Sequence, residues 1–285
     1  MQLRKGGIPV RTYQLVASDL DGTLLDRHGA VSKENLAAIQ KLAEQGVPFV
    51  PVSGRTFDDM PPALKESPFI RYFIYSNGAG ILDRQTGERL LTCLDRETVG
   101  EVYKILKNYD LHLTVRYGGK TYADAGQQTP QAYARYHVCG PHRQLIEEHA
   151  TCSVDLMGQL AELDQVEGIT MFFSSQQDWV ACRGQLAQLA QVAGADSWPY
   201  CYEIYNPQAG KGKALLALTQ WLKLLPSQTV AVGDGGNDVA LLQAAGLSLA
   251  VANATPQIKA LARQVICSNE EHAIHYIYNH YFERR

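Results

Sequence analysis

The sequence predicts an α/β fold: a doubly wound parallel sheet that is interrupted once by an inserted α/β domain. Three observations lead to this prediction. Short apolar runs alternate with helical patterns in both the N-terminal and the C-terminal part of the chain, polar clusters follow the apolar runs, and a long middle segment separates the two parts. Alternating strands and helices are typical of a parallel sheet with helices on both faces.

The N-terminal part has a β-α-β-α-β order. Tyr13–Ser18 is a short, mostly apolar run of the kind that forms a buried parallel strand. A helix is expected next, with Ser32 as its N-cap. Two further apolar runs, Val47–Val52 and Phe69–Tyr75, are expected as strands. Pro51 is unusual for a central strand, because proline has no N–H to donate to a neighbouring strand.

The same alternation resumes near the C-terminal end. Lys213–Leu225 has the spacing of an amphipathic helix, and Thr229–Val232 follows as a strand. A short helix at Val239–Ala245 leads to a further strand at Leu247–Val251. The Thr255-Pro256 pair then indicates a helix start, because threonine is a good N-cap and proline fits the first turn. These elements extend the parallel sheet that the first part of the chain begins.

The middle segment is predicted to be a separate domain. Its strand-like runs are Leu111–Tyr117, Ile169–Ser174 and Trp179–Arg183, and its helical runs are Glu97–Asn108, Arg143–His149 and Gln185–Ala193. We therefore expect a Rossmann-like core from residues 1–82 and 200–285 and an inserted α/β domain from residues 83–199.

Composition excludes several classes of protein. The 285 residues are 46% hydrophobic with a net charge of −3, which argues against disorder and against binding to nucleic acid through bulk charge. The six cysteines form no C-x-x-C pair, as expected of free thiols in a reducing cytoplasm. The uncharged stretch Val239–Ile258 contains turn and cap residues, so we do not interpret it as a membrane span. We expect a cytoplasmic monomer or homodimer without membrane or nucleic-acid partners.

Four polar clusters carry the candidate chemistry. They are Asp19-Leu20-Asp21-Gly22-Thr23, Ser53-Gly54-Arg55, Gly210-Lys211-Gly212 and Asp234-Gly235-Gly236-Asn237-Asp238. Parallel sheets bind ligands beyond the carboxyl ends of their strands, where these clusters are expected to meet. Carboxylates gathered there would repel one another unless a hard cation such as Mg²⁺ joined them. Lys211, Arg55 and the backbone amides near Gly22 and Gly54 suit a phosphate dianion.

This set of groups is suited to phosphoryl transfer. An aspartate held beside a cation and a phosphoryl group can attack phosphorus and form an aspartyl-phosphate. A second carboxyl two residues further on can protonate the leaving oxygen and later take a proton from water. A Walker-type nucleotide loop is not indicated, because Gly210-Lys211-Gly212 lacks the upstream glycine and the serine or threonine after the lysine.

The four clusters resemble the motifs of the haloacid dehalogenase-like phosphatases. Ser18–Leu25 reads S-D-L-D-G-T-L-L, which is similar to the first motif of that family. Ser53–Arg55, Lys211–Gly212 and Gly233–Asp238 are similar to its second, third and fourth motifs, although Gly210 stands where a serine usually precedes the lysine. Asn77-Gly78-Ala79 and the long insertion are similar to the Cof-like subgroup, whose members carry an α/β cap between the second and third motifs.

The resemblance implies a role for each matching residue. Asp19 is implied as the nucleophile and a Mg²⁺ ligand, and Asp21 as the general acid/base and a further ligand through its backbone carbonyl. Asp234 is implied as another Mg²⁺ ligand, with Asp238 as a ligand or as support behind the ligands. The residues implied to hold the phosphoryl group, or to brace its loop in the case of Arg55, are Ser53, Gly54, Arg55, Lys211 and Asn237. Lys213 is a second, less well matched candidate for the role of Lys211.

We therefore predict a Mg²⁺-dependent phosphatase that hydrolyses a small phosphorylated metabolite, such as a sugar phosphate, through an aspartyl-phosphate. The alternatives are a phosphotransferase or mutase with the same residues, and a sensor that binds phosphorylated metabolites without turnover. Histidines and cysteines between residues 137 and 152 have the composition of a zinc site but no standard ligand spacing. We interpret them as loop and helix-surface residues.

Overall fold

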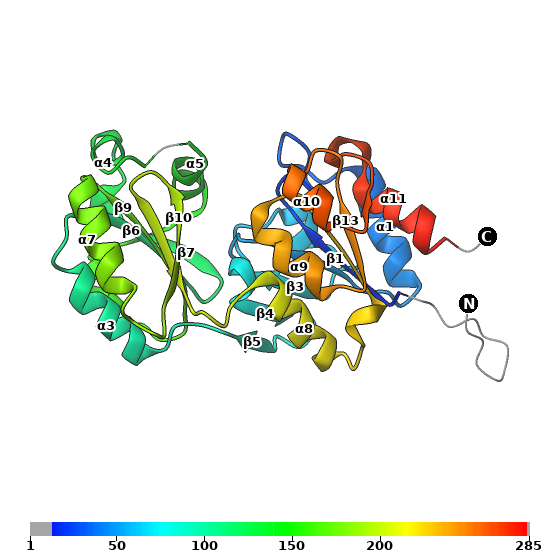
Figure 1. Cartoon of the computed structure of the whole chain (residues 1–285), viewed down its shortest axis with the longest axis horizontal. Helices are drawn as coiled ribbons and strands as arrows, with labels where there is room; N and C mark the ends of the chain where they lie inside the picture. Colours follow the sequence, from blue (N-terminus) through cyan, green and yellow to red (C-terminus); the bar gives the residue numbers. More distant parts are fainter. Residues whose placement is uncertain (1–12, 139, 284–285) are drawn as a thin grey trace. The chain divides into compact units, whose positions relative to one another are not determined.

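The computed structural model describes residues 13–138 and 140–283, which divide into two compact units (Figure 1). The first unit contains the chain up to Gly54, Pro61–Arg89 and the chain from Gly210 onwards. The second unit contains Arg55–Met60 and Leu90–Ala209. Among the described residues, no helix combines the length and the apolar character that crossing a bilayer requires.

A sheet of eight strands forms the centre of the first unit within the described part of the chain. The strands are β1 (Leu15–Asp19), β2 (Phe49–Val52), β3 (Tyr72–Tyr75), β4 (Gly80–Asp83), β5 (Arg89–Leu91), β12 (Thr229–Gly233), β13 (Leu247–Ala250) and β14 (Gln264–Val265). Their order is β14-β13-β12-β1-β2-β3-β4-β5. The pairs from β14 to β3 are parallel, and β3 pairs with β4 in antiparallel fashion. All five residues of β1 are buried, as expected for a strand covered on both faces.

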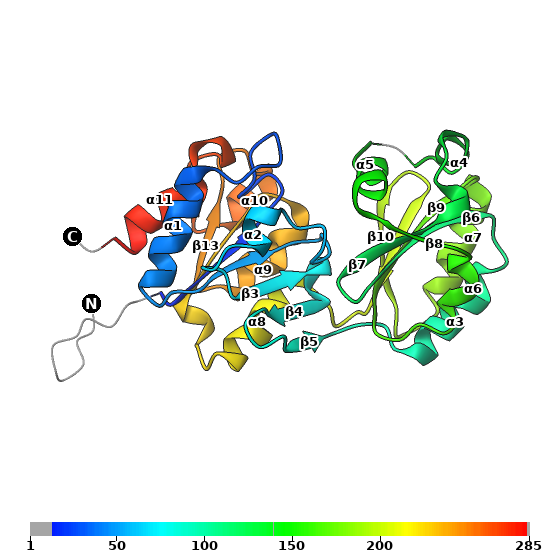
Figure 2. The ribbon, with the colours of Figure 1, turned by 180° about the vertical axis from the view of Figure 1, so that it is seen from behind.

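Helices cover both faces of this sheet, so the predicted α/β fold with a parallel core is confirmed. On one face α8 (Lys211–Trp221) packs against α9 (Val239–Ala244), and on the other α1 (Lys33–Glu44) packs against α11 (Ala273–Tyr281) (Figures 1 and 2). The remaining helical segments of this unit are α2 (Pro62–Lys65), α10 (Pro256–Leu261), η1 (Ser76–Gly78), η3 (Pro226–Gln228), η4 (Gly236–Asp238) and η5 (Asn269–Glu271).

Both predicted helix starts are present. The Ser32 hydroxyl accepts a hydrogen bond from the Asn35 N–H at 3.2 Å. The Thr255 hydroxyl accepts one from the Ile258 N–H at 3.4 Å, and Pro256 occupies the first turn of α10. Each hydroxyl satisfies an N–H that has no partner inside its helix, which is why these residues define where α1 and α10 begin.

Pro51 lies in a central strand, contrary to the usual preference, and the hydrogen-bond pattern explains why. Pairing of β2 with β3 joins Val52 to Ile74, and the Ser53 N–H donates to the Ile74 carbonyl at 3.0 Å. Both contacts come after Pro51 in the strand. On the β1 side, the Val16 N–H donates to the carbonyl of Pro48. The hydrogen bonds between β2 and β3 therefore begin after Pro51, so the N–H that proline lacks is not one of their donors.

The second unit is a mixed sheet with helices on both faces. Its strands are β6 (Leu111–Tyr117), β7 (Lys120–Asp124), β8 (Thr151–Ser153), β9 (Val166–Phe173), β10 (Ala193–Trp198) and β11 (Cys201–Tyr205), in the order β10-β11-β9-β6-β7-β8. One face packs on α3 (Arg96–Leu106), α6 (Leu156–Leu160) and α7 (Gln176–Leu186). The other face packs on α4 (Pro130–Arg135) and α5 (Gly140–His149), with η2 (Ala125–Gln127) after β7.

The boundaries of the two units differ from the predicted division at residues 83 and 199. The first unit continues to Arg89, the first residue of β5, because β4 pairs with β3 and β5 lies next to β4 in the sheet. Residues 200–209, predicted as core, belong to the second unit, because β11 forms a hairpin with β10 and pairs with β9. Residues 55–60 also belong to the second unit. Strand pairing between distant segments decides these boundaries, and local apolar patterns do not reveal it.

The predicted strand at Trp179–Arg183 and helix at Gln185–Ala193 are wrong. Trp179–Arg183 lies inside α7, which continues to Leu186, and the segment from there to Ala193 is turn followed by the start of β10. The Ser175 hydroxyl caps α7 by accepting from the Asp178 N–H at 3.1 Å. The aromatic and β-branched residues of this run have strand propensity, but the cap and packing against the sheet outweigh it.

Candidate active site

The predicted clusters of the first unit lie at the carboxyl ends of neighbouring parallel strands. Asp19 is the last residue of β1, Ser53 directly follows β2, and Asp234 directly follows β12. Because β1 lies between β2 and β12 in the sheet, these three ends meet at one edge. Lys211, the first residue of α8, completes the group. This is the place where doubly wound sheets bind ligands.

Lys211 joins the carboxylates of the first and fourth motifs. Its Nζ lies 2.6 Å from Asp19 Oδ1 and 2.7 Å from Asp238 Oδ1. The exposed fractions of these side chains are 1% for Lys211, 7% for Asp19 and 0% for Asp238. Lys213 is exposed on α8, so Lys211 is the lysine at the carboxylates. Buried charges require such partners, because each loses its hydration.

Burial dominates the electrostatics of Asp19. Desolvation raises the pKa of its carboxyl to about 7, while the charge of Lys211 opposes the rise and the charges of Asp238 and Asp234 add to it. Burial alone would lower the pKa of Lys211, but attraction to Asp19 and Asp238 outweighs it and the pKa is raised. The attraction of Lys211 therefore does not fully offset the cost of burying the Asp19 charge.

Asp238 has both carboxylate oxygens engaged by the protein. Oδ1 accepts from Lys211 Nζ, and Oδ2 accepts from the N–H groups of Asp234 and Gly235 at 3.0 and 3.1 Å. The side chain thus fixes the loop after β12 and the lysine at the same time. An added Cβ at Gly233 would lie 2.7 Å from the Asp238 side chain, so only glycine leaves room for it.

Asp234 is packed against the first motif. Its Oδ1 accepts a hydrogen bond from Thr23 Oγ1 at 3.2 Å. Gly22 has a left-handed backbone with φ of +79°, and a Cβ there would come within 2.6 Å of Asp234 Oδ2. The pKa of Asp234 is raised, first by burial and then by the charge of Asp238. The turn after β1 therefore needs glycine both for its conformation and for this contact.

Three carboxylates are close enough to share a metal ion. One oxygen from each of Asp19, Asp234 and Asp238 lies within 4.8 Å of the others. Carboxylate oxygens are the ligands that hard divalent cations prefer. Since both oxygens of Asp238 already accept hydrogen bonds, Asp19 and Asp234 fit the ligand role better. Their raised pKa values are consistent with a site that needs additional positive charge.

The histidines and cysteines between residues 137 and 152 form no comparable group among the described residues. His137 stacks on Tyr200 with 4.5 Å between ring centroids, and His142 packs edge-on to Phe172. Cys139 lies outside the described residues. These contacts are those of packing rather than of metal ligation.

The remaining predicted residues differ in their burial. Asp21 is exposed, although its charge contributes to the raised pKa of Asp234. Asn237 is exposed on η4. Arg55 follows Gly54 but belongs to the second unit, where its Nη1 donates to the Asp59 carbonyl at 3.2 Å. Ser53 is buried at the end of β2.

The turn after β3 was not predicted as part of the site. The Asn77 N–H donates to the Ser53 carbonyl at 2.9 Å, and the Asn77 side chain lies against Gly54. Gly78 packs on the backbone of Gly210 and Lys211. The signal in the sequence was the Asn-Gly pair at a strand end, which favours a left-handed turn.

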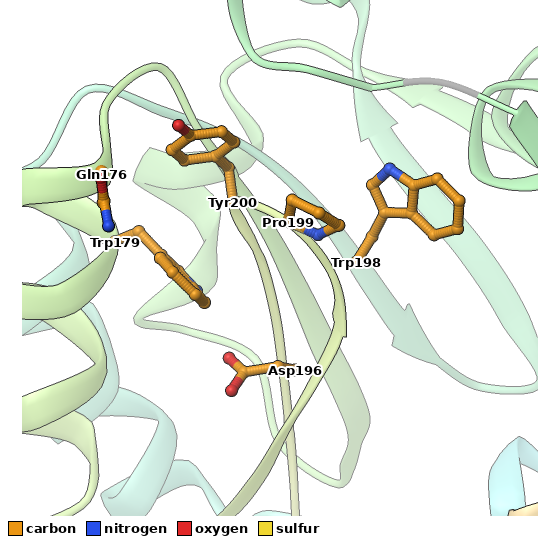
Figure 3. A pocket seen from close by; sticks show the side chains of 6 residues that line it. All are labelled: Gln176, Trp179, Asp196, Trp198, Pro199 and Tyr200. Atoms are coloured by element: carbon orange, nitrogen blue, oxygen red, sulfur yellow. The ribbon is translucent and has the colours of Figure 1, made fainter.

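A separate cavity of about 470 Å³ lies in the second unit (Figure 3). Its lining residues are Gln176, Trp179, Asp196, Trp198, Pro199 and Tyr200. They come from the start of α7, from the end of β10 and from the turn that joins β10 to β11. None of them belongs to the four predicted clusters, and the acidic one, Asp196, forms an ion pair with Arg183 at 2.7 Å. We assign this cavity no part in phosphoryl chemistry.

Several curated proteins resemble the chain over most of its length. The phosphatase YwpJ of Bacillus subtilis is 26% identical over 285 residues, which cover 94% of this chain and 99% of the relative. An HMP-PP phosphatase of Yersinia pseudotuberculosis is 29% identical over 261 residues, which cover 87% of this chain and 86% of the relative. Both relatives are phosphatases by name.

Solved structures share the fold. A haloacid dehalogenase-like hydrolase from Bacteroides thetaiotaomicron matches with a TM-score of 0.78 at 21% identity, covering 95% of this chain and 100% of that chain. The protein TM0651 from Thermotoga maritima matches with a TM-score of 0.76 at 21% identity, covering 95% and 98%. At these identities the likeness establishes the architecture.

The fold and the relatives together define an enzyme of the phosphatase class. A family model described as haloacid dehalogenase-like hydrolase matches residues 16–277. The chain belongs to the haloacid dehalogenase-like hydrolase family, and the predicted resemblance, including its Cof-like subgroup, is confirmed.

Proposed function

We propose that the protein hydrolyses a small phosphorylated metabolite with Asp19 as nucleophile and Mg²⁺ as cofactor. The proposal rests on one observation. The buried Lys211 Nζ lies 2.6 Å from Asp19 Oδ1, and the carboxylates of Asp19, Asp234 and Asp238 lie close enough together to share a metal ion. A buried aspartate between a lysine and a candidate cation site is suited to attack an anionic phosphoryl group, because both positive charges offset its repulsion.

The reaction divides between two aspartates. The Asp19 carboxylate attacks phosphorus as the bond to the leaving oxygen breaks, and Asp21 gives its proton to that oxygen. Asp21 then takes a proton from water as the water attacks the aspartyl-phosphate, which releases inorganic phosphate and restores both side chains. Asp21 is exposed and Asp19 is buried. This difference supports the division, because the acid/base must exchange protons with solvent.

The residues that would hold Mg²⁺ are Asp19 and Asp234 through their carboxylates and Asp21 through its backbone carbonyl, with Asp238 as support. When bound, the ion supplies positive charge to these carboxylates and to the phosphoryl oxygens. Ser53, the Gly54 amide and Lys211 bind the phosphoryl group in this proposal, together with Asn237, and Arg55 braces the loop that follows Gly54. The oxygen-only donor set favours a hard cation over zinc.

Two kinds of support bear on the substrate. A relative of similar length is named an HMP-PP phosphatase, which supports a small phosphorylated compound as the substrate. The net charge of −3 disfavours a polyanionic nucleic acid as the substrate. We infer that the substrate is a phosphomonoester or related ester of a small organic molecule, with a sugar phosphate as one candidate.

Phosphate release from a panel of phosphorylated metabolites, measured with Mg²⁺ and after chelation, tests the proposal. Asp19→Asn should lower kcat by at least roughly 10³-fold, because an amide cannot form the acyl-phosphate. Glu44→Gln, an exposed acid-to-amide change on α1, is the matched control. Full activity in the Asp19 variant, or no Mg²⁺ dependence in the wild type, contradicts the proposal. Transfer of phosphate to a second metabolite instead of water would indicate a phosphotransferase.

A further inference from the structure

The η1 turn after β3 has a strained backbone at the edge of the sheet where the proposed site lies. Ser76, Asn77 and Gly78 are consecutive and all have positive φ, at +50°, +53° and +91°. Glycine and asparagine tolerate this region, but a serine there is uncommon. Strained backbone persists only where its surroundings hold it in place, and it is often found at functional sites.

In the folded structure, this turn contacts the second motif on one side and the third motif on the other. On one side, the Asn77 N–H donates to the Ser53 carbonyl at 2.9 Å. On the other, a Cβ added to Gly78 would lie 2.4 Å from the Gly210 carbonyl oxygen and 2.9 Å from the Lys211 nitrogen. The backbone of the turn is thus in close contact with both segments that are proposed to hold the phosphoryl group.

The Asn77 carboxamide lies directly over Gly54. A Cβ at Gly54 would meet Asn77 Oδ1 at 3.0 Å and Nδ2 at 3.2 Å, so the amide plane occupies the space that a larger residue would fill. Asn77 Oδ1 is buried and has no hydrogen-bond partner among the described residues. This oxygen can only accept hydrogen bonds, so a phosphoryl group could be reached only by the donor Nδ2 at the other end of the same amide.

We propose that Asn77 is a further substrate-binding residue, whose carboxamide donates a hydrogen bond to the phosphoryl group. The inference rests on the proposed function, since it places Asn77 in the same phosphoryl site. The amide is suited to this role because its Nδ2 group is a neutral donor held beside Gly54, and the next residue, Gly78, packs on the start of α8, where an anion is expected. The left-handed backbone of η1 directs the side chain toward this position.

Three variants separate contact with phosphate from a structural role. Asn77→Gly removes the carboxamide and keeps a residue that tolerates positive φ. Asn77→Asp keeps the shape and the backbone preference but replaces the donor by a negative charge. Asn77→Ala removes the carboxamide and strains the backbone. If Asn77 only shapes the turn, Asp is the mildest change; if it contacts phosphate, Asp is the most severe for binding.

The experiment measures KM and kcat for the best substrate of the panel, the Kd of inorganic phosphate by calorimetry, and the melting temperature of each variant. We expect Asn77→Gly to raise KM and the phosphate Kd about 5-fold, the effect of one lost hydrogen bond, and Asn77→Asp to raise them considerably more. Asn77→Ala should resemble Asn77→Gly in binding and be the least stable. Asn108→Asp, which adds the same charge on the second unit, is the control.

Binding in Asn77→Asp equal to wild type, or better than in Asn77→Gly, overturns the inference. An equal shift in Asn108→Asp does so as well. The proposed function fails separately: if the wild type releases no phosphate from any substrate, the phosphate Kd series still tests Asn77. A wild type that neither turns over nor binds phosphate contradicts both.

Discussion

At the scale of single residues, Lys211 controls the balance of charge in the site. It is the buried cation within hydrogen-bond reach of both Asp19 and Asp238. Burial raises the pKa of Asp19 to about 7, and the attraction of Lys211 only partly opposes this rise. A buried ion group of this kind is sensitive to the loss of one member, because the others are left without compensation.

Lys211→Met should therefore lower both stability and activity. Methionine has a similar length but no charge, so Asp19 and Asp238 lose their shared partner. We expect the free energy of unfolding to fall by about 3–5 kcal/mol without divalent metal, and Mg²⁺ to recover part of the loss. Urea denaturation with and without Mg²⁺ measures both effects. Lys213→Met, on the exposed side of α8, is the control, and equal stability of the two variants would contradict the prediction.

At the scale of elements, the segment Arg55–Met60 is anchored on the β6–β7 hairpin of the second unit. The Asp58 N–H donates to the Gly119 carbonyl at 2.9 Å. Asp59 is 3% exposed, and its Oδ2 accepts hydrogen bonds from Thr56 and Thr121 at 2.6 and 2.9 Å. Directional bonds to a buried carboxylate hold the segment in one geometry.

Replacing Thr121 tests this anchor. Thr121→Val keeps the shape of the side chain but leaves Asp59 with a single hydroxyl partner, so we expect the second unit to lose roughly 1–3 kcal/mol of stability. Thr121→Ser keeps the hydroxyl and should retain most of it. The measurement is urea unfolding followed by fluorescence of Trp179 and Trp198, which lie in the second unit, in a Trp221→Phe background that removes the tryptophan of the first unit. If valine and serine behave alike, the hydroxyl is not the anchor.

At the scale of the whole molecule, the two units differ in what their cores contain. The buried strands of the first unit carry their polar groups at their ends, whereas the second unit has a histidine inside its core. His112 is 0% exposed, and its ring lies 5.9, 6.2 and 5.7 Å from the rings of Tyr133, Tyr136 and Phe172. Neither ring nitrogen has a hydrogen-bond partner among the described residues.

This burial predicts acid sensitivity of the second unit. Desolvation lowers the pKa of His112 from 6.5 to about 4. The unfolded state then binds a proton more readily than the folded state, so the contribution to stability is complete above pH 6.5 and is lost as the pH falls toward 4, by roughly 3 kcal/mol in all. Urea unfolding between pH 7.5 and 4 measures the loss. In His112→Phe, the free energy of unfolding should depend less on pH over this range. An unchanged pH dependence would contradict the assignment of the acid sensitivity to His112.

Much of the architecture and the chemistry could be predicted from local sequence. Apolar runs, the caps at Ser32 and Thr255 and the order of the four clusters indicated the parallel core, because strand burial and helix capping depend on a few neighbouring residues. The clusters also indicated which side chains would meet at the strand ends, and the structure brings Asp19, Lys211, Asp234 and Asp238 together there. The roles of these residues remain predictions.

Tertiary structure alone decided the rest. The pairing of β11 with β9 moved residues 200–209 into the second unit, and α7 replaced the strand expected at Trp179–Arg183. The place of Asn77 over Gly54 likewise depends on two strands that pair across some twenty residues of chain. Such contacts follow from strand register and close packing between segments far apart in the sequence, which no local pattern of residue types contains.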